Sequence, residues 1–157
     1  MNTRALLFAA LGISAACLAA PLIGAAASPA QPPASLRLEL FVNDVPASRD
    51  FYHDVLGFAV EREDKGYTVV RLGGIQFGLS IAKGLSSKHY FNPELQAQRR
   101  GLGAEIVLEI PSVDDALQHV QQHGYKVLTG IQKRPWGARD FRLADPDGYY
   151  LRLTSPQ

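Results

Sequence analysis

The chain has 157 residues, of which 46% are hydrophobic and 20% are charged. This length favours one domain with a substantial core, and the composition is that of a globular protein rather than a disordered or fibrous one. The 16 Lys and Arg residues against 15 Asp and Glu residues give a net charge of +1 without a basic stripe. We therefore expect neither a nucleic-acid partner nor a polybasic helix for a membrane surface.

The first 27 residues have the pattern of a secretory signal peptide. A single positive residue, Arg4, precedes an apolar run over 5–20, and three small residues at 25–27 form a cleavage site before Ser28. We expect a secreted or periplasmic protein that leaves the membrane in its mature form. The alternative is an uncleaved membrane anchor, because residues 5–27 reach the roughly 20 residues that span a bilayer.

Cys17, the only cysteine, adds lipidation as a third option for this segment. If the segment is cleaved, the mature chain has no thiol, no disulfide and no cysteine metal ligand. Residues 28–35, rich in Pro, Ala and Ser, predict a flexible tether, and we expect the folded domain over 36–155.

Residues 36–84 predict a first module of one strand, one helix and three further strands. Residues 36–42 alternate polar and apolar side chains, which is typical of a half-buried strand. Residues 45–57 have an early proline, apolar pairs four residues apart and a terminal glycine, which predict an amphipathic helix. Glycine-containing turns separate the three strands that we expect around 58–64, 67–72 and 75–82.

Residues 103–155 repeat this plan after a polar, irregular linker over 85–102. The repeat predicts a strand, a helix and three strands around 104–110, 113–124, 125–131, 138–144 and 149–155. Val45–Gly57 aligns with Val113–Gly124, and an Asp-Pro-Asp-Gly turn ending at Gly148 aligns with Gly74. We expect an α+β fold in which tandem βαβββ modules form a curved, cup-shaped mixed sheet with helices on its outer face.

Two segments, FVNDVPASRDFYHDVLGF and PWGARDFRLADPDGYYLRL, resemble the vicinal oxygen chelate superfamily of glyoxalases, bleomycin resistance proteins and extradiol dioxygenases. The resemblance covers 36–155 and implies a homodimer with its site on the concave sheet face. It also implies up to four metal ligands, at positions that fall on Arg37, Gly78, Glu105 and Arg152. Arginine has no lone pair to offer, glycine has no side chain, and one carboxylate falls short of about three ligands. We therefore predict no metal and no cofactor.

Strand alternation and the resemblance together place aromatic, arginine and carboxylate side chains on the concave face. The candidate ligand-binding residues are Arg37, Glu39, Phe41, Gln76, Glu105, Glu109, Trp136, Tyr150 and Arg152. In one interpretation they bind a small aromatic or carboxylate-bearing molecule, with Arg152 holding its anionic group and Tyr150 and Phe41 stacking on it. In the other, Arg37 pairs with Glu105, and Arg152 pairs with Glu39 or Glu109, which closes the cup.

Three functions remain open from the sequence. The first is an exported, metal-free protein that binds a small organic ligand. The second is a metal-dependent lyase, isomerase or dioxygenase that resembles lactoylglutathione lyase, and the third is a structural or interaction protein with a closed cup. No catalytic residue can be assigned. His119 and His123, four residues apart on the second helix, are expected at the surface, whereas His89 in the linker could reach the cup.

Overall fold

The computed structural model describes residues 35–91 and 100–156. The elements, in chain order, are β1 (Leu38–Val42), α1 (Val45–Asp50), η1 (Phe51–Val55), β2 (Ala59–Asp64), β3 (Tyr67–Leu72), β4 (Ile75–Ile81), β5 (Ile106–Glu109), α2 (Val113–Gln122), β6 (Val127–Lys133), β7 (Arg139–Ala144) and β8 (Tyr150–Thr154). The proposed signal peptide and nearly all of the tether lie outside the described residues. Among the residues that are described, no helix has the length and apolar character needed to cross a membrane.

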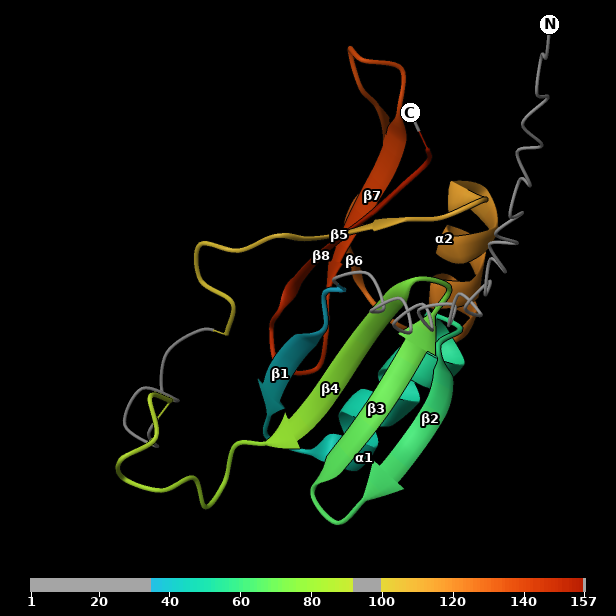
Figure 1. Cartoon of the computed structure of the whole chain (residues 1–157). Helices are drawn as coiled ribbons and strands as arrows, with labels where there is room; N and C mark the ends of the chain where they lie inside the picture. The colour runs from blue at the N-terminus through green and yellow to red at the C-terminus, as the bar shows by residue number, and fades with distance from the viewer. Residues whose placement is uncertain (1–34, 92–99, 157) are drawn as a thin grey trace, which may run out of the picture. The chain divides into compact units, whose positions relative to one another are not determined.

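The strands form two four-stranded sheets of identical topology (Figure 1). The first has the order β1-β4-β3-β2 and the second the order β5-β8-β7-β6. In each sheet the first strand pairs in parallel with the last strand, and the other neighbours pair antiparallel. This arrangement confirms the predicted α+β fold of tandem βαβββ modules.

The aligned positions of the two modules have the same structural roles. The side chain of Asp44 accepts a hydrogen bond from Ala47 N at the start of α1, and Ser112 accepts one from Asp115 N at the start of α2. Short polar side chains at this position satisfy backbone N–H groups that the helix itself leaves free. The internal repeat is therefore present in the structure as well as in the sequence.

The first helix differs from the prediction in its second half. Residues 51–55 are wound as a π-helix, a rare and short form of helix. Phe51, Tyr52 and Val55 are all buried in this turn, so the wider winding directs three large side chains inward. Gly57, with φ of 75°, ends the segment in the left-handed conformation that favours glycine.

One hydrophobic core draws its buried side chains from both modules. Helix α1 packs against β3 and β4, and α2 packs against β6 and β7. The rings of Phe51 and Tyr125, one from each module, lie with centroids 4.9 Å apart. The two modules are therefore parts of one domain.

The turn between β7 and β8 holds the second module against the first. The carboxylate of Asp145 accepts a hydrogen bond from the Tyr52 hydroxyl at 3.0 Å. The carboxylate of Asp147 accepts bonds from the backbone N–H of Asn43 at 2.8 Å and from the Ser48 hydroxyl at 3.1 Å. Two carboxylates of one turn therefore satisfy donors on the segment that runs from the end of β1 through α1 into η1.

Tyr149, in the same turn, covers the outer edge of β1. Its hydroxyl accepts a hydrogen bond from the backbone N–H of Phe41 at 3.1 Å and donates one to the carbonyl of Phe41 at 3.2 Å. β1 is an edge strand, so these groups have no strand neighbour on that side. A side chain of the second module thus completes the hydrogen bonding of the first.

Candidate functional site

A pocket of about 520 Å³ lies beside β1, and we call it the aromatic pocket. Its walls carry five aromatic side chains together with a carboxylate, an arginine and apolar groups. These include Phe41, Tyr90, Phe91, Tyr149, Tyr150, Glu39, Arg100, Leu102 and Ile106. Its volume is in the range of pockets that bind small organic molecules.

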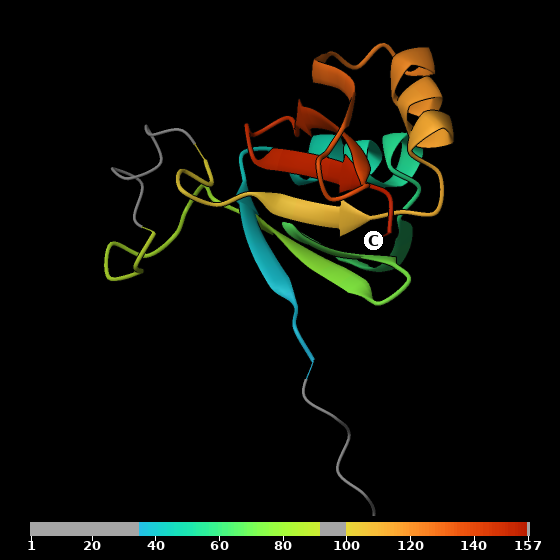
Figure 2. The ribbon, with the colours of Figure 1, turned by 90° about the horizontal axis from the view of Figure 1, so that it is seen from above.

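The linker after β4 supplies one wall of the aromatic pocket. Figure 2 shows the segment from Lys83 to Phe91 extending from the end of β4, away from both helices. The Phe91 ring lies 4.9 Å from the Phe41 ring, and the His89 ring lies 5.3 Å from it. The linker therefore brings His89 to Phe41, as the sequence allowed.

A polar group in the first module lies at the other side of this pocket. Glu39 forms an ion pair with Arg37 at 2.6 Å and accepts a hydrogen bond from the Tyr67 hydroxyl at 3.0 Å. Gly78 lies opposite Glu39 on β4, and a Cβ there would be 2.5 Å from the Tyr67 oxygen and closer still to the Glu39 carboxylate. The absence of a side chain at position 78 is what allows Glu39 and Tyr67 to meet.

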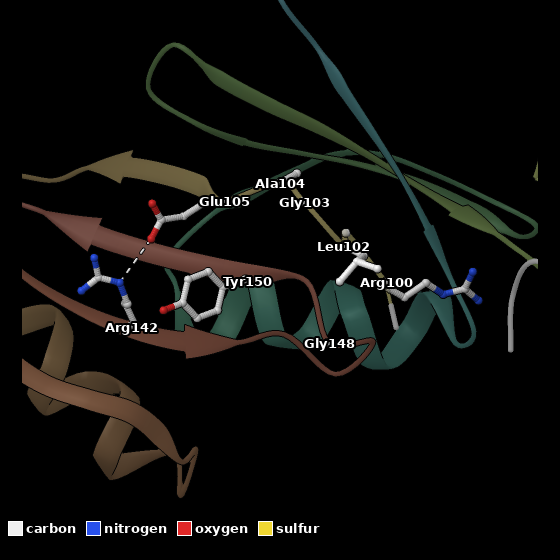
Figure 3. Close-up of a pocket in the computed structure, with 9 residues that line it drawn as sticks. Arg100, Leu102, Gly103, Ala104, Glu105, Arg142, Gly148 and Tyr150 are labelled. Carbon is white, nitrogen blue, oxygen red and sulfur yellow. Dashed lines mark hydrogen bonds and ion pairs between the residues drawn. The ribbon is translucent and has the colours of Figure 1, made fainter. Parts of the chain in front are cut away.

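A second pocket, which we call the arginine pocket, has a volume of about 600 Å³ (Figure 3). Arg100, Leu102, Glu105, Arg142 and Tyr150 contribute its larger side chains, and the small residues Gly101, Gly103, Ala104 and Gly148 line the rest. Both pockets are lined by Tyr150, Arg100 and the segment around Leu102, so they adjoin. A ligand that stacks on Tyr150 has access to both.

A chain of ion pairs extends behind the arginine pocket. Asp140 is 1% exposed and accepts two hydrogen bonds from the Arg134 guanidinium, at 2.6 and 2.7 Å. It also accepts one from Arg142 at 2.9 Å, and Arg142 in turn reaches Glu105 at 3.2 Å. The hydrogen bonds from Arg134 hold the pKa of Asp140 below its ordinary value, and the charge of Arg142 adds to this effect.

Arg152 lies at the end of this chain with its bonding incomplete. It is the cross-strand partner of Arg142, and its nearest acid is Glu105, at 3.7 Å. Its Nε atom is buried without a hydrogen-bond partner among the residues that the structure describes. A buried donor without a partner is uncommon in folded proteins, and a water molecule, an ion or a ligand can satisfy such a group.

Of the candidate ligand-binding residues, Glu39, Phe41 and Tyr150 line the aromatic pocket, and Glu105 and Tyr150 line the arginine pocket. The other five take different places. Arg37 and Arg152 form the ion pairs described above. Gln76 on β4 donates a hydrogen bond to Glu61 on β2, on the far side of β3.

Glu109 and Trp136 lie away from the two pockets. Glu109 lines a separate hollow with Leu72 and Pro111. Trp136 lies in the turn between β6 and β7 and is 54% exposed. The structure therefore does not bring these two residues to the aromatic or the arginine pocket.

The ion pairs expected for a closed cup have different partners from those predicted. Arg37 pairs with Glu39 rather than Glu105, and Arg152 lies near Glu105 rather than Glu39 or Glu109. Each arginine thus meets a carboxylate of its own module. Arg37 lies two residues before Glu39, and Glu105 directly precedes β5, the strand that pairs with β8 and its Arg152. The partners predicted for Arg37 and Arg152 in the closed-cup interpretation were therefore wrong.

The residues at the positions where the vicinal oxygen chelate superfamily has its metal ligands do not fit a metal ion. Arg37 and Arg152 are cations, Gly78 has no side chain, and Glu105 already faces two guanidinium groups. Within 35–91 and 100–156, no group of three or more His, Cys, Asp or Glu side chains could hold a metal ion. The donor set at these positions falls short of the roughly three ligands of a catalytic metal.

Several residues of the two pockets were absent from the sequence prediction. Alternation along 138–144 could have assigned Arg142 to one face of its strand, although its pairing with Arg152 is set by the strand register. By contrast, no periodic pattern marks Tyr90 and Phe91 in the linker, or the reach of Tyr149 to β1. The positions of these three residues beside β1 depend on the tertiary structure, which places the linker and the second module beside the first.

The paired modules, with pockets along β1 and before β5, define an α+β protein of the vicinal oxygen chelate type. Residues 35–153 match the family described as the Glyoxalase/Bleomycin resistance protein/Dioxygenase superfamily, and the chain belongs to this family. A bleomycin resistance protein of Geobacillus stearothermophilus is 27% identical over 111 residues, which cover 68% of this chain and 84% of that protein. A bleomycin resistance protein of Staphylococcus aureus shows the same values.

Solved structures share the fold at lower identity. A glyoxalase/bleomycin resistance protein/dioxygenase from Nocardioides has a TM-score of 0.63 and 22% identity, covering 81% of this chain and 85% of that one. TioX from Micromonospora sp. ML1 has a TM-score of 0.62 and 18% identity, covering 78% of this chain and 98% of that one. At these identities the likeness concerns the fold alone.

Proposed function

We propose that this protein binds a small aromatic organic molecule without a metal ion. The observation that carries the proposal is the aromatic pocket beside β1, which adjoins a pocket lined by arginine. Aromatic walls bind a planar ligand through apolar contact and offset stacking, and a nearby guanidinium binds an anionic substituent. The likeness to proteins described as bleomycin resistance proteins supports the binding of an organic molecule.

The aromatic pocket predicts specific binding of planar probes. We expect 2-naphthoate to raise the melting temperature of the full chain, and Phe41→Ala to weaken naphthoate binding by about 2 kcal/mol, since a ring is lost from the wall. Titration calorimetry measures the affinity. Trp136→Ala, which removes an aromatic side chain outside both pockets, is the matched control and should leave it unchanged.

The same melting experiment decides between this proposal and the alternative of a metal-dependent lyase, isomerase or dioxygenase. A metal at 100 times its Kd adds roughly 2.7 kcal/mol of stability. We expect no such gain with Zn²⁺, Ni²⁺ or Fe²⁺. A stoichiometric metal retained through dialysis, with no response to any aromatic probe, would contradict the binding proposal.

We further propose that the protein is exported and acts as a homodimer. The N-terminal sequence pattern supports export, and the exposed side chains of Tyr90 (82%) and Leu102 (78%) beside the aromatic pocket offer apolar surface to a second copy. Native mass spectrometry of exported material should give twice the mass of a chain that begins at Ser28. Full-length chain recovered from the membrane fraction would instead support an anchor.

A further inference from the structure

Two arginines face each other across neighbouring strands in the second module. Arg142 on β7 and Arg152 on β8 are direct cross-strand partners, an arrangement that is unfavourable for like charges unless an anion lies between them. Glu105 supplies that anion, with its carboxylate 3.2 Å from Arg142 and 3.7 Å from Arg152. Figure 3 shows Glu105 directed toward Arg142 in the pocket wall.

Arg142 is fixed independently of Glu105. A second nitrogen of its guanidinium donates to the buried carboxylate of Asp140 at 2.9 Å, and Arg134 holds both oxygens of that carboxylate. Arg142 therefore keeps its position when Glu105 moves away. A donor group held in place by other contacts binds an incoming ligand with little loss of conformational freedom.

Glu105, in contrast, is loosely held. Its distances to the two arginines are longer than the 2.6 to 2.9 Å found within the Asp140 group, and the buried Arg152 Nε remains without a hydrogen bond among the described residues. Its side chain is 32% exposed. It directly follows the small residues Gly103 and Ala104, which line the same pocket.

We infer that Arg142 and Arg152 form a receptor for a ligand carboxylate, and that Glu105 occupies this receptor until the ligand displaces it. The inference rests on the proposed function, because the receptor adjoins the aromatic pocket through Tyr150. The internal occupant is itself a carboxylate, so the geometry selects an aromatic carboxylic acid over a neutral aromatic compound. Glu105 thus acts as a competitor of the ligand.

Substituting a residue that competes with the ligand should increase the affinity for the ligand, whereas substituting a residue that binds the ligand should decrease it. The three arginines Arg134, Arg142 and Arg152 face two carboxylates, Glu105 and Asp140, which leaves a net charge of 3 − 2 = +1. Neutralising Glu105 raises this charge to +2 and removes the competing group. Glu105→Gln should therefore bind 2-naphthoate at least tenfold more tightly than the unmodified chain.

The test is titration of the full chain and of Glu105→Gln with 2-naphthoate and with its neutral analogue 2-naphthalenemethanol. We expect tighter binding of the acid only, with the alcohol unchanged. Glu109→Gln, the same substitution at the far end of β5 and in a separate hollow, should leave both affinities as they are. Arg152→Gln should weaken the binding of the acid and leave the binding of the alcohol unchanged. This variant keeps the inference testable if Glu105→Gln does not fold.

The outcomes separate the inference from the proposed function. If Glu105→Gln binds the acid no more tightly than the unmodified chain while both compounds bind, the receptor is overturned and the aromatic pocket stands. If neither compound binds to any variant, both are overturned. If Glu109→Gln increases the affinity for the acid as much as Glu105→Gln does, the increase comes from the net charge of the protein. That outcome would also overturn the receptor.

Discussion

Replacing Asp145 with alanine should lower the free energy of unfolding by about 3 kcal/mol at neutral pH, because buried donors lose their acceptor. The carboxylate accepts hydrogen bonds from the Tyr52 hydroxyl at 3.0 Å and from the backbone N–H groups of Asp147 and Tyr149 at 3.0 and 2.8 Å. Tyr52 is fully buried, so water cannot replace the lost partner. Denaturant unfolding of the two proteins measures the difference.

Asp145→Asn is the matched control for this prediction. An amide keeps the shape and retains one oxygen for the two backbone N–H groups, and its NH₂ group can donate to the Tyr52 hydroxyl. We expect its stability at neutral pH to lie within about 1 kcal/mol of the unmodified chain. An equally large loss in Asp145→Asn would contradict the assignment of the effect to hydrogen bonding.

Asp145 should also make the stability of the protein depend on pH, and Asp145→Asn is the control for this effect as well. Burial raises the pKa of Asp145 from 3.8 to about 6, so between these values the folded protein holds a proton that the unfolded chain releases. The free energy of unfolding should therefore increase as the pH falls through this window, by up to roughly 3 kcal/mol, and decrease as the pH rises. In Asp145→Asn this contribution should be absent. Identical pH profiles for the two proteins would show that Asp145 does not titrate in this way.

Replacing Asp140 with alanine is expected to have the second large effect. Its carboxylate is 1% exposed and holds Arg134 and Arg142, whose side chains are only 19% and 16% exposed. Removing one partner of such a pair leaves uncompensated charge in a poorly solvated place, and we expect a loss of about 3 kcal/mol. The lowered pKa of Asp140 also means that this stabilisation decreases as the pH falls below its ordinary value of 3.8.

Asp114→Ala provides a control with the same bond geometry. Asp114 also accepts two hydrogen bonds from one arginine, Arg139, at 2.5 and 2.9 Å, but its side chain is 61% exposed. Exposed pairs of this kind contribute little to stability, because solvent screens their charges. Denaturant unfolding should therefore separate the two variants clearly. Equal losses would mean that burial is not what makes the Asp140 pair important.

The sequence by itself was sufficient to predict the helices and strands and their order along the chain. Alternation marked the strands, the early Pro46 and the terminal Gly57 and Gly124 marked the helices, and self-similarity marked the two modules. These signals are local, because each depends on the conformation of a few consecutive residues. They also placed Arg152 beside Tyr150 and Thr154 on alternate positions of the last strand.

Tertiary structure decided which of these residues meet. Tyr149 binds the backbone of Phe41 across 108 positions, and Asp145 binds Tyr52 across 93. Alternation tells which face a side chain occupies, but not which neighbouring strand or module supplies its partner, so the pairing of Arg152 was predicted incorrectly. The partner is set by strand register and by the packing of one module on the other, and both depend on contacts between residues far apart in the chain.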